Sequence, residues 1–76
     1  MQELRELVSE IPDFPKPGIL FRDISPLLRE RFSATIAAVE ALFSEDEWHR
    51  VDAVAGIESR GFILASALAE RRGKGF

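Results

Sequence analysis

The feature that most constrains the fold is the stretch of residues 51–62, VDAVAGIESRGF, in which three kinds of segment follow one another. Residues 51–55 are short and mostly apolar, as expected of a strand covered on both faces of a parallel sheet. Gly56 and Gly61 bracket the next four residues, and glycine lets a backbone turn sharply or approach a bound group closely. Helix formers then occupy residues 62–72. The stretch predicts a strand, a tight loop and a helix.

A loop at the start of a helix is attractive to phosphate or pyrophosphate, because free backbone N–H groups and the positive end of the helix dipole meet there. Arg60 adds a guanidinium suited to two-pronged binding of phosphate oxygens. Gly73 is a natural stop for the helix, and Arg71 and Arg72 suit its negative end. The alternative is a purely structural turn, since the spacing is neither that of a dinucleotide fingerprint nor that of a P-loop.

Composition excludes several classes of protein. The 76 residues allow one small domain, and the net charge of −3 indicates no nucleic-acid-binding face. Cysteine is absent and His49 is the single histidine, which leaves no thiolate site and little support for a histidine-rich metal site or a Ser/His/Asp triad. No apolar run approaches the roughly 20 residues of a membrane span, and the acidic start is unlike a signal peptide. We expect a soluble, cytoplasmic protein without a membrane segment.

The N-terminal residues predict an amphipathic helix. Leu4, Leu7, Val8 and Ile11 fall at i, i+3, i+4 and i+7, and Pro12 would close the helix. A stripe of this kind is expected to be a packing face.

Residues 11–28 cannot be regular helix in their first half, because three prolines each fix φ and favour an extended residue before them. Residues 19–24 are expected to be extended, with Ser25 as N-cap and Pro26 as first residue of a short helix. The segment is then either a stiff connection or the preordered wall of a pocket. In the second case an apolar side chain such as Phe21 would stack on a flat ligand while backbone groups read its edge.

A further helix is expected over residues 33–43, where apolar residues recur and alanines add helix propensity. Residues 44–47, SEDE, are expected to form a solvated turn rather than a metal or acid/base site. Trp48 is expected to cap the edge of the sheet, and His49 has no evident partner as a metal ligand.

The last helix is apolar almost all round and is expected to need cover on several sides. Only residues 51–55 read clearly as a strand, and a parallel strand needs neighbours reached through crossovers. Residues 74–76 look like the turn into another strand. We therefore expect an N-terminal part of a larger α/β domain, or a chain that borrows strands from a partner.

Two motifs together resemble a known family. Residues 12–28, PDFPKPGILFRDISPLL, followed after one helix by residues 55–62, AGIESRGF, closely resemble the N-terminal part of adenine phosphoribosyltransferases. The first motif is specific to the adenine enzymes, and the second occurs more generally in type I phosphoribosyltransferases. The resemblance implies a Rossmann-like parallel-sheet domain, of which residues 1–28 would be a helix and adenine hood segment. Residues 29–76 would form a helix, a strand, the pyrophosphate loop and a helix.

The resemblance implies purine salvage by a glycosyltransferase: adenine and 5-phosphoribosyl 1-pyrophosphate (PRPP), with Mg²⁺, give AMP and pyrophosphate. The adenine hood would include Leu20, Phe21 and Arg22. The pyrophosphate loop would comprise the run Glu58, Ser59, Arg60 and Gly61, with a non-proline cis peptide near the Glu58–Ser59 step and Arg60 as the catalytic residue. No residue of the chain is assigned as a metal ligand, and the complete protein is expected to be a homodimer.

The 76 residues lack two parts of the family pattern. One is an acidic pair followed by a Thr-Gly-Gly-Thr-like loop, which grips the ribose and its 5-phosphate, and the other is the mobile loop that covers the site and carries a catalytic acid. We therefore expect the 76-residue chain to be inactive alone. Two alternatives stay open. The chain could be a non-catalytic binding or dimerisation module that uses uncovered apolar surface. It could also belong to a related phosphoribosyltransferase that acts on another base or serves as a purine-sensing regulator.

Overall fold

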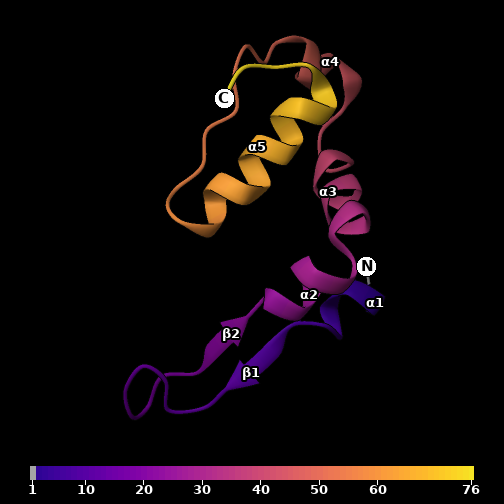
Figure 1. Ribbon diagram of the computed structural model, residues 1–76. Coiled ribbons are helices and arrows are strands. Elements are labelled where there is room, and N and C mark those ends of the chain that lie inside the picture. Colours follow the sequence, from indigo (N-terminus) through magenta and orange to yellow (C-terminus); the bar gives the residue numbers. More distant parts are fainter. Residues whose placement is uncertain (1) are drawn as a thin grey trace. The chain divides into compact units, whose positions relative to one another are not determined.

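The computed structural model describes residues 2–76, which divide into two compact units, one ending at Thr35 and the other formed by Ile36–Phe76 (Figure 1). Each unit is described by itself. The helices and strands are α1 (Gln2–Arg5), β1 (Ser9–Ile11), β2 (Phe21–Asp23), α2 (Ser25–Glu30), α3 (Phe32–Glu40), α4 (Glu45–His49) and α5 (Arg60–Arg72).

The first unit is built on an antiparallel hairpin of β1 and β2, in which Ile11 is paired with Phe21 and Ser9 with Asp23. The N-terminal helix predicted to run to Ile11 is wrong beyond Arg5, because residues 9–11 form β1 instead. Pro12 disfavours the helical conformation at Ile11. Pairing with β2 satisfies the backbone of residues that a short helix would hold only weakly, since isolated short helices are marginal in water.

The extended segment predicted at residues 19–24 contains β2, and α2 follows it directly. The helix begins one residue earlier than expected, with Ile24 as N-cap and Ser25 inside the helix, so the prediction of Ser25 as N-cap is wrong. Asp23 Oδ1 accepts hydrogen bonds from the Ser25 N–H at 3.0 Å and from the Ser25 hydroxyl at 2.8 Å. The Asp23 side chain therefore supports the turn that the Ser25 side chain was expected to support.

The second unit has a small apolar core of Ile36, Trp48 and Leu68. Partly buried side chains packed against this core are Val39, Val51, Val54, Leu64 and Ala67. Trp48 is only 4% exposed, and its Nε1–H donates to the Glu40 carbonyl at 3.0 Å. The prediction that Trp48 caps a sheet edge is therefore wrong: Trp48 is part of the buried core, with its one polar group satisfied.

The acidic run is the beginning of α4 rather than an irregular turn. Ser44 Oγ accepts from the Glu47 N–H at 3.1 Å, and Glu47 Oε1 accepts from the Ser44 N–H at 2.8 Å, which is a capping box. The four side chains are exposed, as expected. Carboxylates in a first turn also suit the positive end of the helix dipole, so this run has a structural explanation.

Residues 51–55 are extended but form no regular strand, which corrects the sequence prediction. Ala53 and Gly75 make one isolated parallel bridge, in which the Val54 N–H donates to the Gly75 carbonyl at 2.8 Å. The Gly75 N–H in turn donates to the Asp52 carbonyl at 3.3 Å. A regular strand needs several residues paired with a neighbouring strand. Among the described residues, this segment is paired in parallel with another segment at one position only. The expected turn toward a second strand at residues 74–76 agrees with this bridge.

Helix α5 (Arg60–Arg72) confirms the predicted helix, and Gly73 caps its C-terminal end in the left-handed conformation at φ 66°. One face packs into the core through Ala65, Leu68 and Ala69, which are buried. Phe62 and Ile63 near its start remain 46% and 45% exposed. The cover expected on several sides is thus present on one face only among the described residues.

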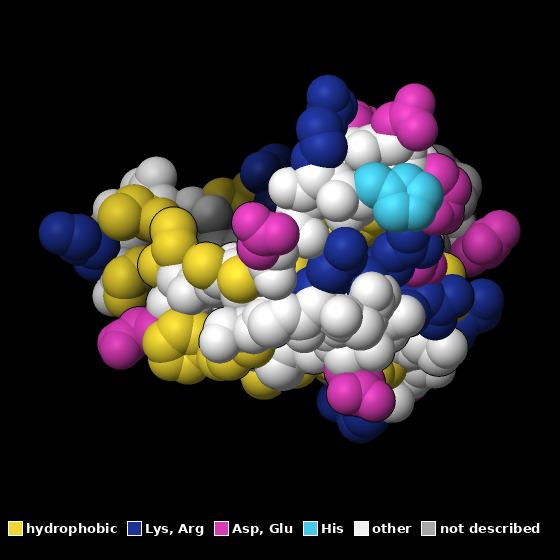
Figure 2. Space-filling view, turned by 90° about the horizontal axis from the view of Figure 1, so that it is seen from above, with side chains coloured by type: hydrophobic (Ala, Val, Ile, Leu, Met, Phe, Trp, Pro, Cys, Tyr) yellow, Lys and Arg dark blue, Asp and Glu magenta, His cyan; other side chains and the backbone are white. Residues whose placement is uncertain are grey.

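None of the described helices has the length and apolar character required to cross a membrane. Acidic and basic side chains lie among one another on the face drawn in Figure 2, so neither sign forms a continuous field there.

Candidate phosphate and base sites

The loop between the extended segment and α5 folds back so tightly that two glycine backbones touch. A Cβ atom placed on Gly56 would lie 2.2 Å from the Gly61 carbonyl oxygen and 3.0 Å from the Ala65 Cβ. A Cβ on Gly61 would lie 3.2 Å from the Gly56 carbonyl carbon. Glycine at position 56 is therefore required by space, because any side chain would displace the backbone at the start of α5.

This fold of the loop places Glu58 and Ser59 in an exposed turn and Arg60 at the first position of α5. The peptide bond between Glu58 and Ser59 is cis, as the resemblance led us to expect. The Ser59 side chain makes no capping hydrogen bond to the first turn. The first turn of a 13-residue helix thus keeps the electrostatic character that favours an anion, with a guanidinium at the same end.

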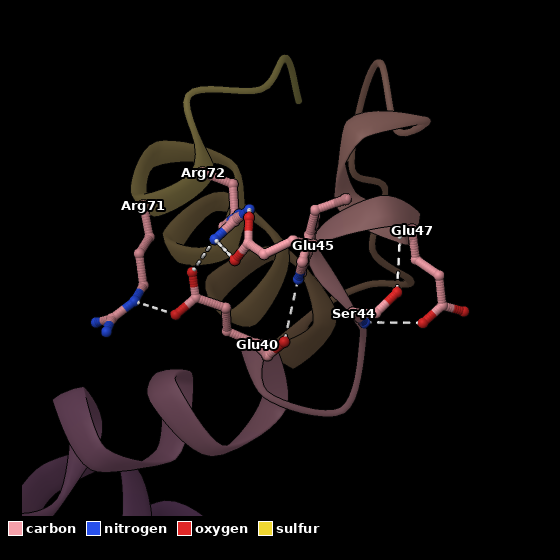
Figure 3. Close-up of polar contacts among 7 residues, drawn as sticks. Glu40, Ser44, Glu45, Glu47, Arg71 and Arg72 are labelled. Carbon is pink, nitrogen blue, oxygen red and sulfur yellow. Dashed lines mark hydrogen bonds and ion pairs between the residues drawn. The ribbon is translucent and has the colours of Figure 1, made fainter.

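The other end of α5 is anchored by a cluster of charges that we call the arginine clasp, formed by Glu40, Glu45, Arg71 and Arg72 (Figure 3). Arg71 Nε lies 2.6 Å from Glu40 Oε1, and Arg72 Nη1 lies 3.0 Å from Glu40 Oε2. Arg72 Nη2 also lies 2.7 Å from Glu45 Oε2, and its guanidinium stacks over the Trp48 ring at 5.1 Å. The clasp joins α5 to the end of α3 and the start of α4.

The clasp sets the protonation of its own carboxylates. Hydrogen bonds from Arg71 and then Arg72 lower the pKa of Glu40 below its ordinary value. A hydrogen bond from Arg72 likewise lowers the pKa of Glu45, and the two carboxylates, Glu45 first, raise the pKa of Arg72. The sequence placed Arg71 and Arg72 correctly at the negative end of the helix, but nothing in the local pattern indicated Glu40, which is more than 30 residues away.

The residues predicted for the adenine hood lie at the second arm of the hairpin. Leu20 precedes β2 and is 47% exposed, and Phe21 and Arg22 are in β2. The Phe21 ring meets the Phe14 ring edge to face, with ring centres 5.2 Å apart. Arg22 is exposed and lies 3.7 Å from Glu10 across the strand pair. Ligand sites commonly combine apolar side chains with a few polar groups that fix orientation, and both kinds of group are present here.

The structure therefore brings Leu20, Phe21 and Arg22 together in the first unit and Glu58, Ser59, Arg60 and Gly61 together in the second. Asp13, whose carboxylate closes the hairpin loop, was not indicated by sequence reasoning. Among residues 2–76 there is no group of three or more His, Cys, Asp or Glu side chains placed to hold a metal ion. The carboxylates of Glu40 and Glu45 are engaged with arginines, and that of Glu47 accepts from the Ser44 N–H.

Comparison with known proteins gives a consistent result. The chain is 60% identical over 73 residues to adenine phosphoribosyltransferase of Hydrogenovibrio crunogenus, covering 96% of this chain and 42% of that protein. It is 50% identical over 74 residues to the enzyme of the same name from Bdellovibrio bacteriovorus, covering 97% of this chain and 44% of that protein. The chain thus spans less than half the length of these curated relatives. No family model matches the chain.

Solved structures agree with the sequence comparison. Adenine phosphoribosyltransferase of Rhodothermus marinus superposes with a TM-score of 0.84 at 40% identity, over 99% of this chain and 42% of that one. The Saccharomyces cerevisiae enzyme, solved with an imino-altritol bisphosphate and adenine, superposes with a TM-score of 0.87 at 38% identity, over 99% and 46% of the two chains.

The fold is thus that of the N-terminal part of a type I phosphoribosyltransferase domain, which confirms the α/β class expected from the sequence. Within that class, the chain corresponds to the N-terminal part of the adenine phosphoribosyltransferases.

Proposed function

We propose that the protein containing this sequence transfers the 5-phosphoribosyl group of PRPP to adenine and releases AMP and pyrophosphate, a step of purine salvage. The observation that carries the proposal is the 60% identity to an adenine phosphoribosyltransferase along 96% of the chain. The adenine bound in the Saccharomyces cerevisiae structure supports the choice of base. We place the activity in the complete protein and expect residues 1–76 alone to be inactive.

The loop before α5 is proposed to bind the pyrophosphate of PRPP through Glu58, Ser59, Arg60 and Gly61. As the bond from ribose C1 to pyrophosphate breaks, negative charge grows on the leaving group. N–H groups preset at the start of α5 and the Arg60 guanidinium favour that charge more than they favour the ground state. Because the glycine contact fixes the loop, these donors need little rearrangement when the charge develops.

The hairpin is proposed to act as the hood over adenine. Leu20 and Phe21 supply an apolar surface, and Phe14 supports the Phe21 ring from one side. Backbone groups at Leu20, Phe21 and Arg22 read the edge of the base, which suits a segment whose side chains are largely occupied or exposed. In this proposal the side chains supply apolar contact and the backbone supplies recognition of the base edge, so a strand next to an aromatic pair can bind adenine without a pocket of polar side chains.

The remaining parts of the proposal concern Mg²⁺, assembly and location. The described residues do not fit a metal cage of their own, so we propose that Mg²⁺ enters bound to the phosphates of PRPP. We further propose a homodimer as the complete enzyme, and a cytoplasmic location, where a highly charged sugar phosphate would be available. Size measurement of the complete protein in solution tests the homodimer, and fractionation of cells tests the cytoplasmic location.

The proposal is tested with Arg60→Ala in the full-length enzyme. Loss of one group that stabilises developing charge is expected to lower kcat by about 10² to 10³. Arg60→Lys keeps the charge but loses the planar fork, so an intermediate kcat is expected. Arg50→Ala, which removes an exposed arginine at the end of α4, is the matched control and should leave kcat unchanged. Unaltered kinetics in Arg60→Ala would remove Arg60 from the mechanism.

Base specificity is tested by comparing turnover with three bases. Adenine, hypoxanthine and xanthine are each offered with PRPP, and release of pyrophosphate is measured. We expect turnover with adenine and little with the other two bases. Preference for hypoxanthine or xanthine would favour a related phosphoribosyltransferase, and binding without turnover would favour a purine-sensing regulator.

A further inference from the structure

The side chain of Asp13 takes part in closing the loop that joins β1 to β2. The Gly18 N–H donates to Asp13 Oδ1 at 2.9 Å, across five residues of loop. Beside this bond, the Phe14 N–H donates to the Ile19 carbonyl at 3.0 Å. These two hydrogen bonds tie the two arms of the loop together just beyond the last strand pair, Ile11 with Phe21.

The composition of the loop makes the Asp13 carboxylate hard to replace by backbone groups. Positions 12, 15 and 17 are prolines, which have no N–H, so the loop has few donors with which to build a ladder. Asp13 itself has φ 55°, in the left-handed region that Asp, Asn and Gly tolerate better than other residues. Position 13 therefore requires both a side-chain acceptor and tolerance of positive φ.

The closure lies next to the groups proposed to read adenine. Phe14 follows Asp13 directly, and its ring packs on Phe21 at 5.2 Å. Ile19, which accepts from the Phe14 N–H, directly precedes Leu20. Leu20 is 47% exposed and Phe14 is 49% exposed, so packing alone does not fix this end of the hairpin. The hydrogen bond to Asp13 and the backbone bond from Phe14 to Ile19 supply the restraint that packing does not, and the first of these depends on a side chain.

We propose that Asp13 is a positioning residue for adenine: through Gly18 and Phe14 it fixes the arm that carries Leu20 and Phe21, without touching the base. This inference rests on the proposed function. It predicts an effect confined to the base, because the closure belongs to the first unit and the pyrophosphate loop to the second.

The test uses three substitutions in the full-length enzyme. Asp13→Gly keeps the tolerance of positive φ but removes the acceptor, and Asp13→Ala removes both. Each is expected to raise KM for adenine about threefold to tenfold, the ratio that corresponds to one hydrogen bond of ordinary strength. KM for PRPP and kcat should change less than twofold. Asp13→Asn keeps an oxygen acceptor in the same place and should restore KM for adenine to nearly the wild-type value.

Lys16→Ala is the matched control, because Lys16 contributes its carbonyl to the loop while its side chain is exposed. It should leave both KM values unchanged. Three results would each overturn the inference while the proposed function stands. They are equal impairment of Asp13→Asn and Asp13→Gly, an equal rise in KM for adenine and for PRPP, and wild-type kinetics in both Asp13→Gly and Asp13→Ala. Wild-type enzyme that is inactive with adenine would overturn both. Because both Asp13→Gly and Asp13→Ala are measured, the test still gives a result if one of these variants fails to fold.

Discussion

Gly56→Ala tests whether contact between two backbones fixes the loop before α5, which we propose binds pyrophosphate. The added methyl group would lie 2.2 Å from the Gly61 oxygen and 2.5 Å from the Gly61 carbonyl carbon, whereas real Cβ contacts are essentially never shorter than 3.0 Å. The oxygen must therefore move by at least 0.8 Å, the difference between 3.0 and 2.2 Å. The Ala65 Cβ, at 3.0 Å, limits escape on the side of α5.

Two consequences follow from that displacement. Overpacking of this kind typically lowers the free energy of unfolding by about 1–3 kcal/mol. A misplacement approaching 1 Å at a group that aligns a reacting substrate costs on the order of 10²-fold in rate. We therefore expect kcat/KM for PRPP to fall by roughly 10- to 100-fold at temperatures where Gly56→Ala is still folded. KM for adenine should change little, since adenine is assigned to the hairpin.

The assay compares urea unfolding and steady-state kinetics of Gly56→Ala with those of Gly75→Ala in the full-length enzyme. The same chemical change at position 75 meets its nearest atoms at 3.7 and 3.8 Å, which is ordinary contact. Gly75→Ala should therefore leave stability unchanged or raise it by about 0.5 kcal/mol through the unfolded state. If Gly56→Ala behaved like Gly75→Ala in both measurements, the argument that space requires glycine at position 56 would be refuted.

Two further predictions concern the support of α5 and α4. Because the arginines of the clasp lower the pKa of Glu40, this carboxylate contributes stability that is present above its ordinary pKa of 4.5 and is lost as pH falls through the lower pKa of the folded state. In Glu40→Gln, the urea midpoint of unfolding should therefore fall less steeply with pH below about pH 4.5 than in wild type. Glu70 is an exposed residue of α5 outside the clasp, so Glu70→Gln should keep the wild-type profile. Identical profiles for Glu40→Gln and wild type would show that the clasp does not contribute to stability. Ser44→Ala removes the Ser44 hydroxyl from the capping box and should lower the free energy of unfolding, measured by urea titration, by about 1 kcal/mol. Ser33→Ala, at an exposed position inside α3, should lower it by less than about 0.5 kcal/mol. Equal effects would contradict the role of the cap.

The sequence alone determined those features that depend on local chemistry. Two closely spaced glycines before a run of helix formers predicted the loop and α5, and Gly73 predicted its end, because glycine tolerates backbone conformations that other residues avoid. Prolines likewise predicted that residues 12–18 are not helical. The two motifs indicated the family and, through it, the cis peptide between Glu58 and Ser59. The roles of the hood and loop residues stay predictions.

Tertiary structure decided the features that depend on partners far away in the chain. The periodicity from Leu4 to Ile11 fits a helix, yet residues 9–11 pair with β2, because a hairpin partner outweighs weak helix propensity in a short segment. Trp48 is buried because α4 brings it to the core between Ile36 and Leu68. Glu40 meets Arg71 and Arg72 across more than 30 residues, and no local pattern specifies such a contact. Local propensity reports the backbone of each segment, whereas burial and ion pairing depend on which segments pack together.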